Sequence, residues 1–369
     1  MLVRKFIRED FENLKKFVDK EIPGAHCLDL GFNEHWFNPS KEKEWNIILL
    51  ERDNDDIAGY IFYIKVPVWF LGKEDQILWI STGAVDGAAR KKGEGIKLYL
   101  WLYRNHSLVG AMSGNKNSLP INSKLGLDVD EEIMRRYIYV NNMENVIGLC
   151  PSDSKEDLLK LRFSPIKNTT YQSEVVTKIP EDYDSLWINF RKNLLLTVDK
   201  NSKYLAWRYI HSPYIKYTLI SISSNQILQG FAIVRIQKTP QGNVARIMEM
   251  ITLPDSSYDA WLSLLYYCQE ARLIFFDFMV IGTIYDSILK RIGMIKIEPN
   301  SIESSIPHLL SPVEHRAWSN SFHIGGTNVR QDMSWRNKNV IYFTKGDSDR
   351  DWPTAFDIGN VTEKNMLRG

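Results

Sequence analysis

The chain has 369 residues, enough for about two domains of ordinary size. Its 46 lysines and arginines balance 45 aspartates and glutamates, so the net charge of +1 creates no global attraction to nucleic acid or to an anionic membrane. The three cysteines, Cys27, Cys150 and Cys268, lie far apart and form no Cys-x-x-Cys pair. This spacing argues against a disulfide framework or a zinc site and favours reduced thiols in the cytoplasm.

Charged residues occur too soon after the N-terminus for the apolar segment of a signal peptide. Residues 8–19 have the pattern of an amphipathic helix. The longest apolar run, residues 273–281, contains Asp277 and is about half the length that a bilayer requires. It therefore predicts a buried strand. We expect a cytoplasmic protein with no membrane or nucleic-acid partner, and the sequence leaves its oligomeric state open.

A helix at residues 11–18 and strands at residues 45–51, 57–66 and 77–85 open the first half of the chain. The third strand leads through Arg90-Lys91-Lys92-Gly93-Glu94-Gly95-Ile96 into a helical pattern at residues 96–103. Glycines let the backbone approach a ligand closely, and the first amides of a helix are unpaired donors at the positive end of its dipole. The turn is therefore a candidate binding site for the diphosphate of a nucleotide-like cofactor.

The string lacks the glycine spacing of a Rossmann fingerprint or a P-loop. It resembles instead the acyl-CoA loop of the GNAT acyltransferase superfamily, Q/R-x-x-G-x-G/A. The resemblance implies acetyl-CoA or another short acyl-CoA as cofactor, and an ordinary surface turn is the alternative. The implied cofactor contacts around this loop are Ala84, Val85, Arg90, Lys91, Lys92, Gly93, Glu94, Gly95 and Ile96.

A second part of the same pattern follows the apolar segment at residues 108–112. Asn115, Asn117 and Ser118 precede Lys124-Leu125-Gly126-Leu127, which resembles the strand, asparagine, short helix and K-L-G-F of GNAT proteins. Gly126 has the position of a left-handed helix C-cap. The resemblance implies that Asn115 and Asn117 contact the cofactor and that the strand before them splays to admit its pantetheine arm.

The second half repeats this plan with little residue identity. A helix at residues 182–192, strands at 217–223, 228–237 and 244–253, a helix at 258–271 and a strand at 273–282 end in Lys290-Arg291-Ile292-Gly293-Met294. We therefore predict a mixed α/β fold of two tandem GNAT-like domains, residues 1–150 and 151–369. Each is expected to be a twisted, largely antiparallel sheet flanked by helices.

The two halves differ where the first carries its glycine loop. The second has Leu253-Pro254-Asp255-Ser256-Ser257-Tyr258, with no glycine and with a carboxylate that would repel a diphosphate. Asp255 or Ser256 is expected to cap the following helix. The second half is therefore expected not to bind acyl-CoA, but to shape the acceptor pocket or complete the core of the first half.

Two further strings resemble tandem GNAT-like proteins of bacterial surface-sugar pathways. The first is Tyr204-Leu205-Ala206-Trp207-Arg208-Tyr209 with His211-Ser212-Pro213-Tyr214, in which Trp207 and Arg208 either stack on a base or sugar or pack in the core. The second is the C-terminal Asp347-Ser348-Asp349. Asp347 or Asp349 would hold or deprotonate the ammonium of an acceptor, or else belong to a solvated turn.

GNAT enzymes usually form no covalent intermediate, and their oxyanion donor is a backbone amide of the strand before the loop. The resemblance therefore implies the amides of Ala84 and Val85. Many members place a tyrosine acid where this chain has Asn122, which cannot protonate a thiolate. Either Tyr137 or a water replaces it, or the site is not catalytic.

The general base has several candidates. Asp29, Glu34 and His35 follow the first helix, where GNAT proteins build acceptor contacts, and Glu249 lies on a strand of the second half. Strand alternation is expected to place Ile247, Glu249 and Ile251 on one face. Burial would raise the pKa of Glu249 toward a useful value, whereas an exposed Glu249 would simply be part of a polar face.

Three functional classes remain open. The first is an N-acyltransferase that moves an acetyl or small acyl group to an amine, such as that of a nucleotide-linked amino sugar for cell-surface glycan. The second is a transferase of aminoacyl groups from tRNA, which the near-neutral charge and the CoA-type loop disfavour. The third is a non-catalytic binding protein on a tandem GNAT fold, which Asn122 favours.

Overall fold

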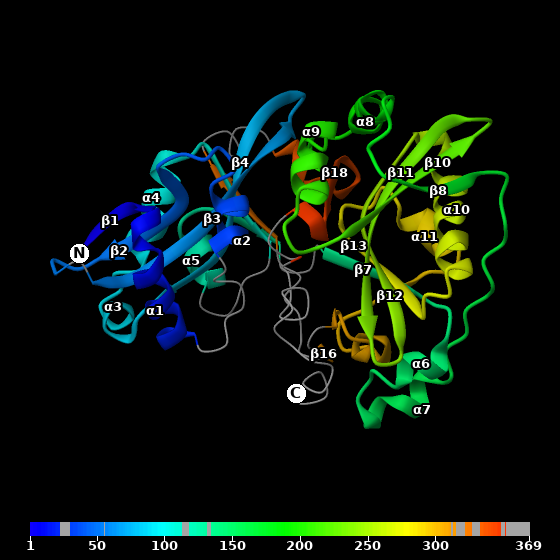
Figure 1. Ribbon diagram of the computed structural model, residues 1–369, viewed down its shortest axis with the longest axis horizontal. Helices are drawn as coiled ribbons and strands as arrows, with labels where there is room; N and C mark the ends of the chain where they lie inside the picture. Colours follow the sequence, from blue (N-terminus) through cyan, green and yellow to red (C-terminus); the bar gives the residue numbers. More distant parts are fainter. Residues whose placement is uncertain are drawn as a thin grey trace.

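The computed structural model describes residues 1–22, 30–54, 56–112, 118–130, 134–310, 313–314, 322–326, 333–347 and 351. Two halves lie side by side, the first drawn in blue and cyan and the second in green and yellow (Figure 1). Within the described ranges the strands join into one sheet of sixteen strands and a separate pair. No helix among these residues is long and apolar enough to cross a membrane.

The first half contains β1 (Leu2–Ile7), η1 (Arg8–Asp10), α1 (Phe11–Glu21), α2 (Leu30–Phe37), β2 (Glu44–Glu51), β3 (Ile57–Phe70), β4 (Lys73–Val85), α3 (Gly87–Lys91), α4 (Ile96–Asn105), β5 (Leu108–Met112), α5 (Ser118–Lys124), β6 (Asp128–Asp130), β7 (Met134–Val140) and α6 (Met143–Ile147). Its helices follow their hydrophobic spacing. In α1, Leu14, Phe17 and Val18 are buried three and four residues apart, while the charged residues between them are exposed.

The second half begins with η2 (Ser152–Ser154), α7 (Lys155–Leu158), β8 (Gln172–Val176), α8 (Tyr183–Arg191), β9 (Leu196–Val198), α9 (Ser202–Leu205) and the π-helical turn η3 (Ala206–Ile210). It continues with β10 (Tyr217–Ser224), β11 (Ile227–Thr239), β12 (Gly242–Thr252), η4 (Pro254–Ser256), α10 (Ser257–Glu270), β13 (Phe275–Ile281), α11 (Asp286–Arg291) and β14 (Ile295–Ile297). The C-terminal elements are η5 (Ile302–Ser305), β15 (Leu309–Leu310), β16 (Val313–Glu314), β17 (Phe322–Gly326), η6 (Ser334–Arg336), η7 (Lys338–Val340), β18 (Ile341–Thr344) and η8 (Lys345–Asp347).

The two halves have the same strand order but exchange one strand. The order is β1-β2-β3-β4-β5-β17-β6 in the first half and β8-β10-β11-β12-β13-β7-β14 in the second. Thus β7, from the first half of the sequence, lies antiparallel between β13 and β14, and β17, from the end of the chain, lies between β5 and β6. Among the described strands of these two orders, only the pairs β4–β5 and β12–β13 are parallel. Each sheet is therefore completed by a strand from the other half.

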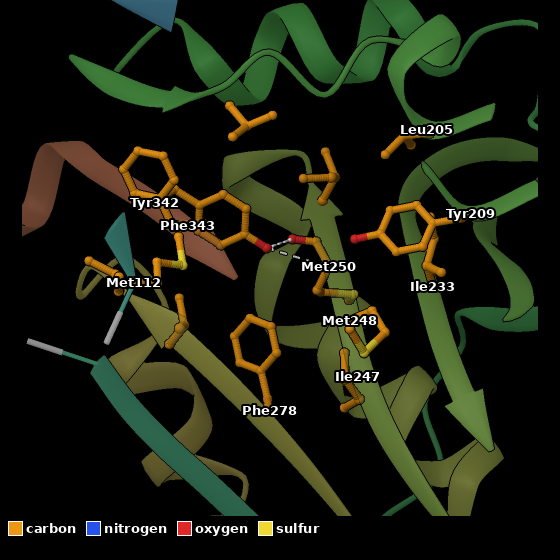
Figure 2. Close-up of a cluster of buried hydrophobic side chains, with 14 of the residues drawn as sticks. Met112, Leu205, Tyr209, Ile233, Ile247, Met248, Met250, Phe278, Tyr342 and Phe343 are labelled. Carbon is orange, nitrogen blue, oxygen red and sulfur yellow. Dashed lines mark hydrogen bonds between the residues drawn. The ribbon is translucent and has the colours of Figure 1, made fainter. Parts of the chain in front are cut away.

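Two short strands also join the halves. β9 pairs with the end of β3, and β18 lies between β9 and β13 (Figure 1). Buried side chains of both halves form one large hydrophobic cluster, and two smaller clusters lie apart from it. Figure 2 shows part of the large cluster, including Met112 of β5 and Phe343 of β18. There the Tyr342 hydroxyl donates to the Met250 carbonyl oxygen at 2.8 Å.

The helix ends of the two halves are equivalent. Gly126 has φ 87° and Gly293 has φ 93°, a backbone region that side chains disfavour. After α5 the Leu127 amide donates to the Asn122 carbonyl, and after α11 the Met294 amide donates to the Leu289 carbonyl, both at 3.0 Å. Both helices therefore end in a Schellman motif, as the glycine positions predict.

Each half also has a bulge at the same place in its central strand. Tyr63 faces Ile80 while Ile61 faces Gly83, so β4 carries an extra residue near Ser81. In β12, Val234 faces Ile247 and Ile233 faces Glu249, so Met248 is the extra residue. Parallel pairing with the next strand ends at Ile80 in the first half and at Ile247 in the second. Beyond these points the described residues show no further pairing of β4 with β5 or of β12 with β13.

The bulge corrects one expectation. Ile247 and Glu249 face adjacent residues of β11, Val234 and Ile233, and therefore lie on opposite faces of the sheet. Simple alternation had placed them together, but one inserted residue shifts the side-chain period by one. Glu249 still shares its face with Ile251, which pairs with Phe231.

Candidate functional site

The basic glycine turn lies between two helices at the end of β4. Arg90 and Lys91 end the short helix α3, and Gly95 is the N-cap of α4. Arg90, Lys91, Lys92 and Gly93 are exposed, and Gly93 has φ 69° with no atom near the position of a β-carbon. A glycine in this conformation leaves open space beside three exposed cations, as a cradle for an anion requires.

Most backbone amides at the start of α4 are already hydrogen-bonded, whereas the sequence predicted that they would be unpaired. Those of Ile96, Lys97 and Leu98 donate to carbonyl oxygens three residues earlier, at 3.3, 3.0 and 3.2 Å. The first turn of α4 is thus tightened and satisfies amides that an ordinary helix start leaves unpaired. The Gly95 amide makes no hydrogen bond within the described part of the chain. It is the donor that this turn offers to an anion.

Neighbouring residues fix the turn against β4. Asp86 accepts a hydrogen bond from the Ala89 amide at 2.8 Å and pairs with Arg52. Burial alone would raise the pKa of Asp86, but the Ala89 amide and Arg52 hold it below its usual value. A β-carbon on Gly95 would lie 3.1 Å from the Val85 side chain. The glycine therefore allows the start of α4 to lie close to the end of β4.

The predicted oxyanion donors lie beside this turn. Ala84 pairs with Tyr60 and Val85 with Gly59, on the β3 side of the strand. Beyond Ile80, β4 has no ladder partner on its other side among the described residues. The end of β4 thus presents an unpaired backbone edge next to the basic turn. Asn115, Asn117, Asp29 and Asp349 lie outside the described residues.

Asn122 and Tyr137 are both buried, in different places. Asn122 of α5 is 3 % exposed, and its Nδ2 lies 3.0 Å from Nδ1 of His323 on the exchanged strand β17. Burial lowers the pKa of His323 to about 4, so its imidazole is neutral at pH 7. Tyr137 of β7 pairs with Phe278 and Lys296 in the sheet of the second half, and burial together with Asp286 raises its pKa. The structure therefore does not place these two candidates together.

A fully buried charge cluster surrounds Glu249. Its Oε1 accepts from Lys200 Nζ at 2.8 Å, from the Tyr209 hydroxyl at 2.7 Å and from the Thr344 hydroxyl at 2.9 Å. Lys200 also pairs with Asp347 of η8, and the Lys200, Glu249 and Asp347 side chains have no solvent exposure. We call these five residues the Glu249 cluster. Glu249 and Asp347 thus belong neither to a polar face nor to a solvated turn.

The electrostatics of the Glu249 cluster favour proton exchange near neutrality. Burial, and then the nearby charge of Asp347, raise the pKa of Glu249 to about 7, although Lys200 and Tyr209 act to lower it. Its second oxygen, Oε2, is buried and accepts no hydrogen bond in the described part of the chain. An orphaned carboxylate oxygen of this kind is uncommon in a folded protein and is suited to accept a proton or a donor group.

Three predicted acceptor residues meet at the junction of the halves. The His35 ring of α2 stacks on Trp207 of η3 with centroids 5.7 Å apart, and the Arg208 guanidinium lies 4.4 Å from the Trp36 ring. Arg208 is 1 % exposed, donates to the Gly346 carbonyl at 2.7 Å, and leaves Nη2 without a partner among the described residues. Trp207 and Arg208 therefore pack the halves together and also adjoin the Glu249 cluster. Glu34 is only half-buried and lies on the same helix as His35.

Sequence reasoning missed Lys200, Tyr209 and Thr344 as members of the Glu249 cluster. Lys200 follows a short apolar run at residues 194–198, and only burial distinguishes it from a surface lysine. A β-carbon on Gly346 would collide with the Tyr209 hydroxyl, so the glycine between Lys345 and Asp347 was the available local signal.

The start of α10 is the counterpart of the basic turn in the second half. Asp255 is exposed there, and Ser256 occupies the N-cap position without a capping side-chain bond. Its hydroxyl donates instead to Gln229, which corrects the expected capping role. A surface hollow at this end of α10 is lined by Asn168, Thr169, Thr170, Asp259 and Leu262. None of these is basic. Among the described residues no cluster of histidine, cysteine and carboxylate side chains could hold a metal ion.

Comparison with solved structures identifies the architecture. A GCN5-related N-acetyltransferase from Anabaena variabilis aligns with a TM-score of 0.55 at 10% identity, over 89% of this chain and 73% of that one. N-myristoyltransferase of Saccharomyces cerevisiae aligns with a TM-score of 0.52 at 11% identity, over 88% and 79%. The chain has the GNAT fold in two tandem copies. The fold class expected from the sequence is therefore confirmed.

A probable N-acyltransferase from Enterococcus faecalis, described as a conserved protein of unknown function, aligns with a TM-score of 0.50 at 12% identity, over 88% of this chain and 71% of that one. No family model and no curated protein sequence matches the chain. At these identities the tandem GNAT likeness establishes the fold, and the chemistry must be argued from the residues.

Proposed function

We propose that the chain is an acyl-CoA-dependent N-acyltransferase, with acetyl-CoA or another short acyl-CoA bound by the first half. The observation that carries the proposal is the basic turn at residues 90–95, with its unpaired Gly95 amide, beside the unpaired edge of β4. The N-myristoyltransferase structure named above was solved with bound myristoyl-CoA, which supports CoA binding on this fold. The localisation that we propose is the cytoplasm.

The residues of the first half have separate tasks in this proposal. Bound acyl-CoA supplies a thioester as the acyl donor. The Gly95 amide and the charges of Lys91 and Lys92 would hold its diphosphate. The backbone amide of Val85 would donate to the carbonyl oxygen as it gains negative charge. The Ala84 amide points the other way, toward β3, because amides alternate along a strand and that of Asp86 donates to Ala58. These groups lie at the end of β4 and in the turn between α3 and α4 that follows it, so one region of the chain positions both parts of the cofactor.

The acceptor would enter at the junction of the halves. An amine attacks only when neutral, and Glu249 has a pKa near 7 and an unpartnered oxygen. We propose Glu249 as the general base, with Trp207 and Arg208 beside it as acceptor contacts. The acceptor class that we propose is a small polar amine such as a nucleotide-linked amino sugar for cell-surface glycan, on the sequence resemblance alone.

Isothermal titration with acetyl-CoA tests the cofactor site. We expect one site per chain in the wild type and loss of binding in Gly95→Trp, because a side chain at this position lacks room against Val85 and would displace the turn. Lys91→Glu with Lys92→Glu is a second variant, since both side chains are exposed and their exchange disturbs no packing. We expect it to weaken binding at least tenfold.

The matched control is Lys15→Glu with Lys16→Glu, which reverses two equally exposed charges on α1. Its affinity should equal that of the wild type. Equal weakening by the control would indicate a general charge effect, and unchanged binding by the loop variants would place the site elsewhere. Failure of the wild type to bind acetyl-CoA and free CoA would reject the proposal and leave the tRNA-dependent transferase to be tested.

A non-catalytic acyl-CoA-binding protein is the second candidate. Lys200 already neutralises part of the charge of Glu249 and Asp347, and Asn122 occupies the position where many GNAT enzymes have a tyrosine. Binding of acetyl-CoA without release of free thiol in the presence of a panel of amino-sugar acceptors would favour this candidate. Thiol release that Glu249→Gln abolishes would favour the enzyme.

A further inference from the structure

The two oxygens of the Glu249 carboxylate have opposite surroundings. Oε1 accepts hydrogen bonds from Lys200, Tyr209 and Thr344, at 2.8, 2.7 and 2.9 Å. Oε2 is also buried and accepts none within the described part of the chain. A carboxylate oxygen has about two lone-pair sites, so three donors saturate Oε1. Oε2 is therefore the oxygen of this carboxylate that has room for a proton.

The Thr344 hydroxyl is held in the direction that this contact needs. Its oxygen accepts from the Gly346 amide at 3.3 Å, and its other acceptor, Asp347 Oδ2, lies at 3.4 Å, farther away than Glu249 Oε1. The Thr344 amide already donates to the same Asp347 oxygen at 2.7 Å. The single hydroxyl proton of Thr344 therefore points to Glu249.

Tyr209 is held by a π-helical turn and by a glycine. The turn η3 carries Trp207, Arg208 and Tyr209, and turns of this kind frequently occur at functional sites. A β-carbon on Gly346 would collide with the Tyr209 hydroxyl and would lie 3.2 Å from Glu249 Oε1. Burial raises the pKa of Tyr209 well above its usual value, so the hydroxyl remains a donor at neutral pH. One turn thus carries both the proposed acceptor contacts and a hydrogen-bond donor to the proposed base.

These contacts give the two oxygens different roles. We propose that Tyr209 and Thr344 are positioning residues, which hold Oε1 of Glu249 so that Oε2 takes the proton of the attacking amine. As the nitrogen bonds to the acyl carbon, its proton passes to Oε2, and the sulfur leaves with the electrons of the broken C–S bond. The role in transfer rests on the proposed function, whereas the preference of the proton for Oε2 does not.

The ionisable groups that face Glu249 come from the elements packed around it. They are Lys200 after β9, Asp347 of η8, Tyr183 of α8, Tyr204 of α9, Tyr209 of η3, Tyr285 at the start of α11 and Tyr342 of β18. Burial raises the pKa of every one of these tyrosines, so they stay neutral near pH 7. The hydrogen bonds from Lys200 and Tyr209 lower the pKa of Glu249, against its burial. Loss of a donor to Oε1 should therefore raise this pKa further.

Infrared spectroscopy of the full chain tests the positioning without any substrate. Each protein is compared with the same protein carrying Glu249→Gln, from about pH 5 to pH 9, and the difference isolates the protonated carboxyl of Glu249. We expect Tyr209→Phe and Thr344→Val each to raise the midpoint of this titration by about one pH unit, because each removes a hydrogen bond to a charged group. The carbonyl band should also move to higher frequency, since Oε1 then has fewer donors.

Two variants are matched controls. Thr344→Ser keeps the hydroxyl and should keep the wild-type midpoint, whereas Thr344→Val has the same branched shape without the hydroxyl. Tyr139→Phe removes a hydroxyl that donates to the Ser164 carbonyl and not to Glu249, and it should change nothing. An unchanged midpoint in Tyr209→Phe or in Thr344→Val, or an equal shift in either control, would overturn the proposal.

Thiol release from acetyl-CoA, with a panel of free and nucleotide-linked amino sugars as acceptors, separates this proposal from the proposed function. The rate should rise with pH through the midpoint of Glu249, and in Tyr209→Phe this rise should move upward by as much as the infrared midpoint does. A rate profile that does not move with the midpoint would overturn the positioning role and leave the transferase standing. Absence of transfer by a wild type that binds acetyl-CoA would reject the role together with the proposed function, while a shifted infrared midpoint would still support the proton on Oε2.

Discussion

Lys200 Nζ lies 2.8 Å from Glu249 Oε1, and neither side chain has any solvent exposure. The two residues come from different elements, since Lys200 follows β9 and Glu249 lies just after the bulge of β12. The same bulge in β4 of the first half exposes the backbone edge proposed as the oxyanion site. The two equivalent bulges therefore differ in their surroundings. The bulge of β4 lies beside the proposed backbone donor, and the bulge of β12 lies beside the buried ion pair.

Breaking the buried pair should be costly. We expect Lys200→Met to lower the free energy of unfolding by about 3 to 5 kcal/mol, because two buried carboxylates lose their cation. Adding Glu249→Gln should restore part of the loss, and the coupling energy from a double-mutant cycle in urea should exceed about 1 kcal/mol. The exposed pair Lys178 and Glu181, 3.4 Å apart, is the control and should give less than about 0.5 kcal/mol. Equal coupling in both pairs would contradict the burial argument.

The raised pKa of Glu249 predicts the sign of a pH effect. A carboxyl whose pKa rises from 4.5 in the unfolded chain to about 7 in the folded one holds its proton more tightly when folded. The stability of the wild type relative to Glu249→Gln should therefore fall from about pH 5 to pH 7, by the order of 1 kcal/mol per pH unit, and level off above pH 7. Urea unfolding of both proteins at four pH values measures this difference. A difference that grows with pH would show that Lys200 dominates and lowers the pKa.

The two helix-ending glycines should be equivalent in energy. Alanine at Gly293 would meet no atom within 4 Å, so only the backbone at φ 93° opposes it. We expect Gly293→Ala and Gly126→Ala each to cost about 1 to 2 kcal/mol in thermal or chemical unfolding. Gly87→Ala is the control, because Gly87 also has open space but no positive φ, and it should be neutral or slightly stabilising. A comparable loss at Gly87 would refute the conformational explanation.

The exchanged strands predict that the halves depend on each other. A fragment of residues 1–150 lacks β17, and a fragment of residues 151–369 lacks β7. Each would expose the unpaired edges of two strands, so we expect separate fragments to aggregate or remain unfolded. Co-expressed fragments should form a complex that is folded by circular dichroism and elutes as one species. Independent folding of either fragment would argue against the exchange as a source of stability.

Much of the first half was predictable because its signals are local. The turn from Arg90 to Gly95 and the helix ends at Gly126 and Gly293 depend on glycine at positions that disfavour a side chain. Such constraints act within a few residues and are visible in a single sequence. The order of the central elements, β2 to β5 in the first half and β10 to β13 in the second, followed from the same short-range periodicity. The strands β1, β6, β7, β8, β9, β14 and β17 were not predicted.

The strand exchange, the bulge and the buried charges became known only from the tertiary structure. Nothing local predicts that β7 and β17 exchange halves, that Met248 forms a bulge, or that Lys200, Glu249 and Asp347 meet without solvent. The sequence determined where the chain turns and which segments are apolar, since these depend on backbone freedom and side-chain spacing. It did not determine which charges are buried together, because the pairing of distant strands controls solvation, and solvation controls whether a lysine or a glutamate is an ordinary surface group or part of a site.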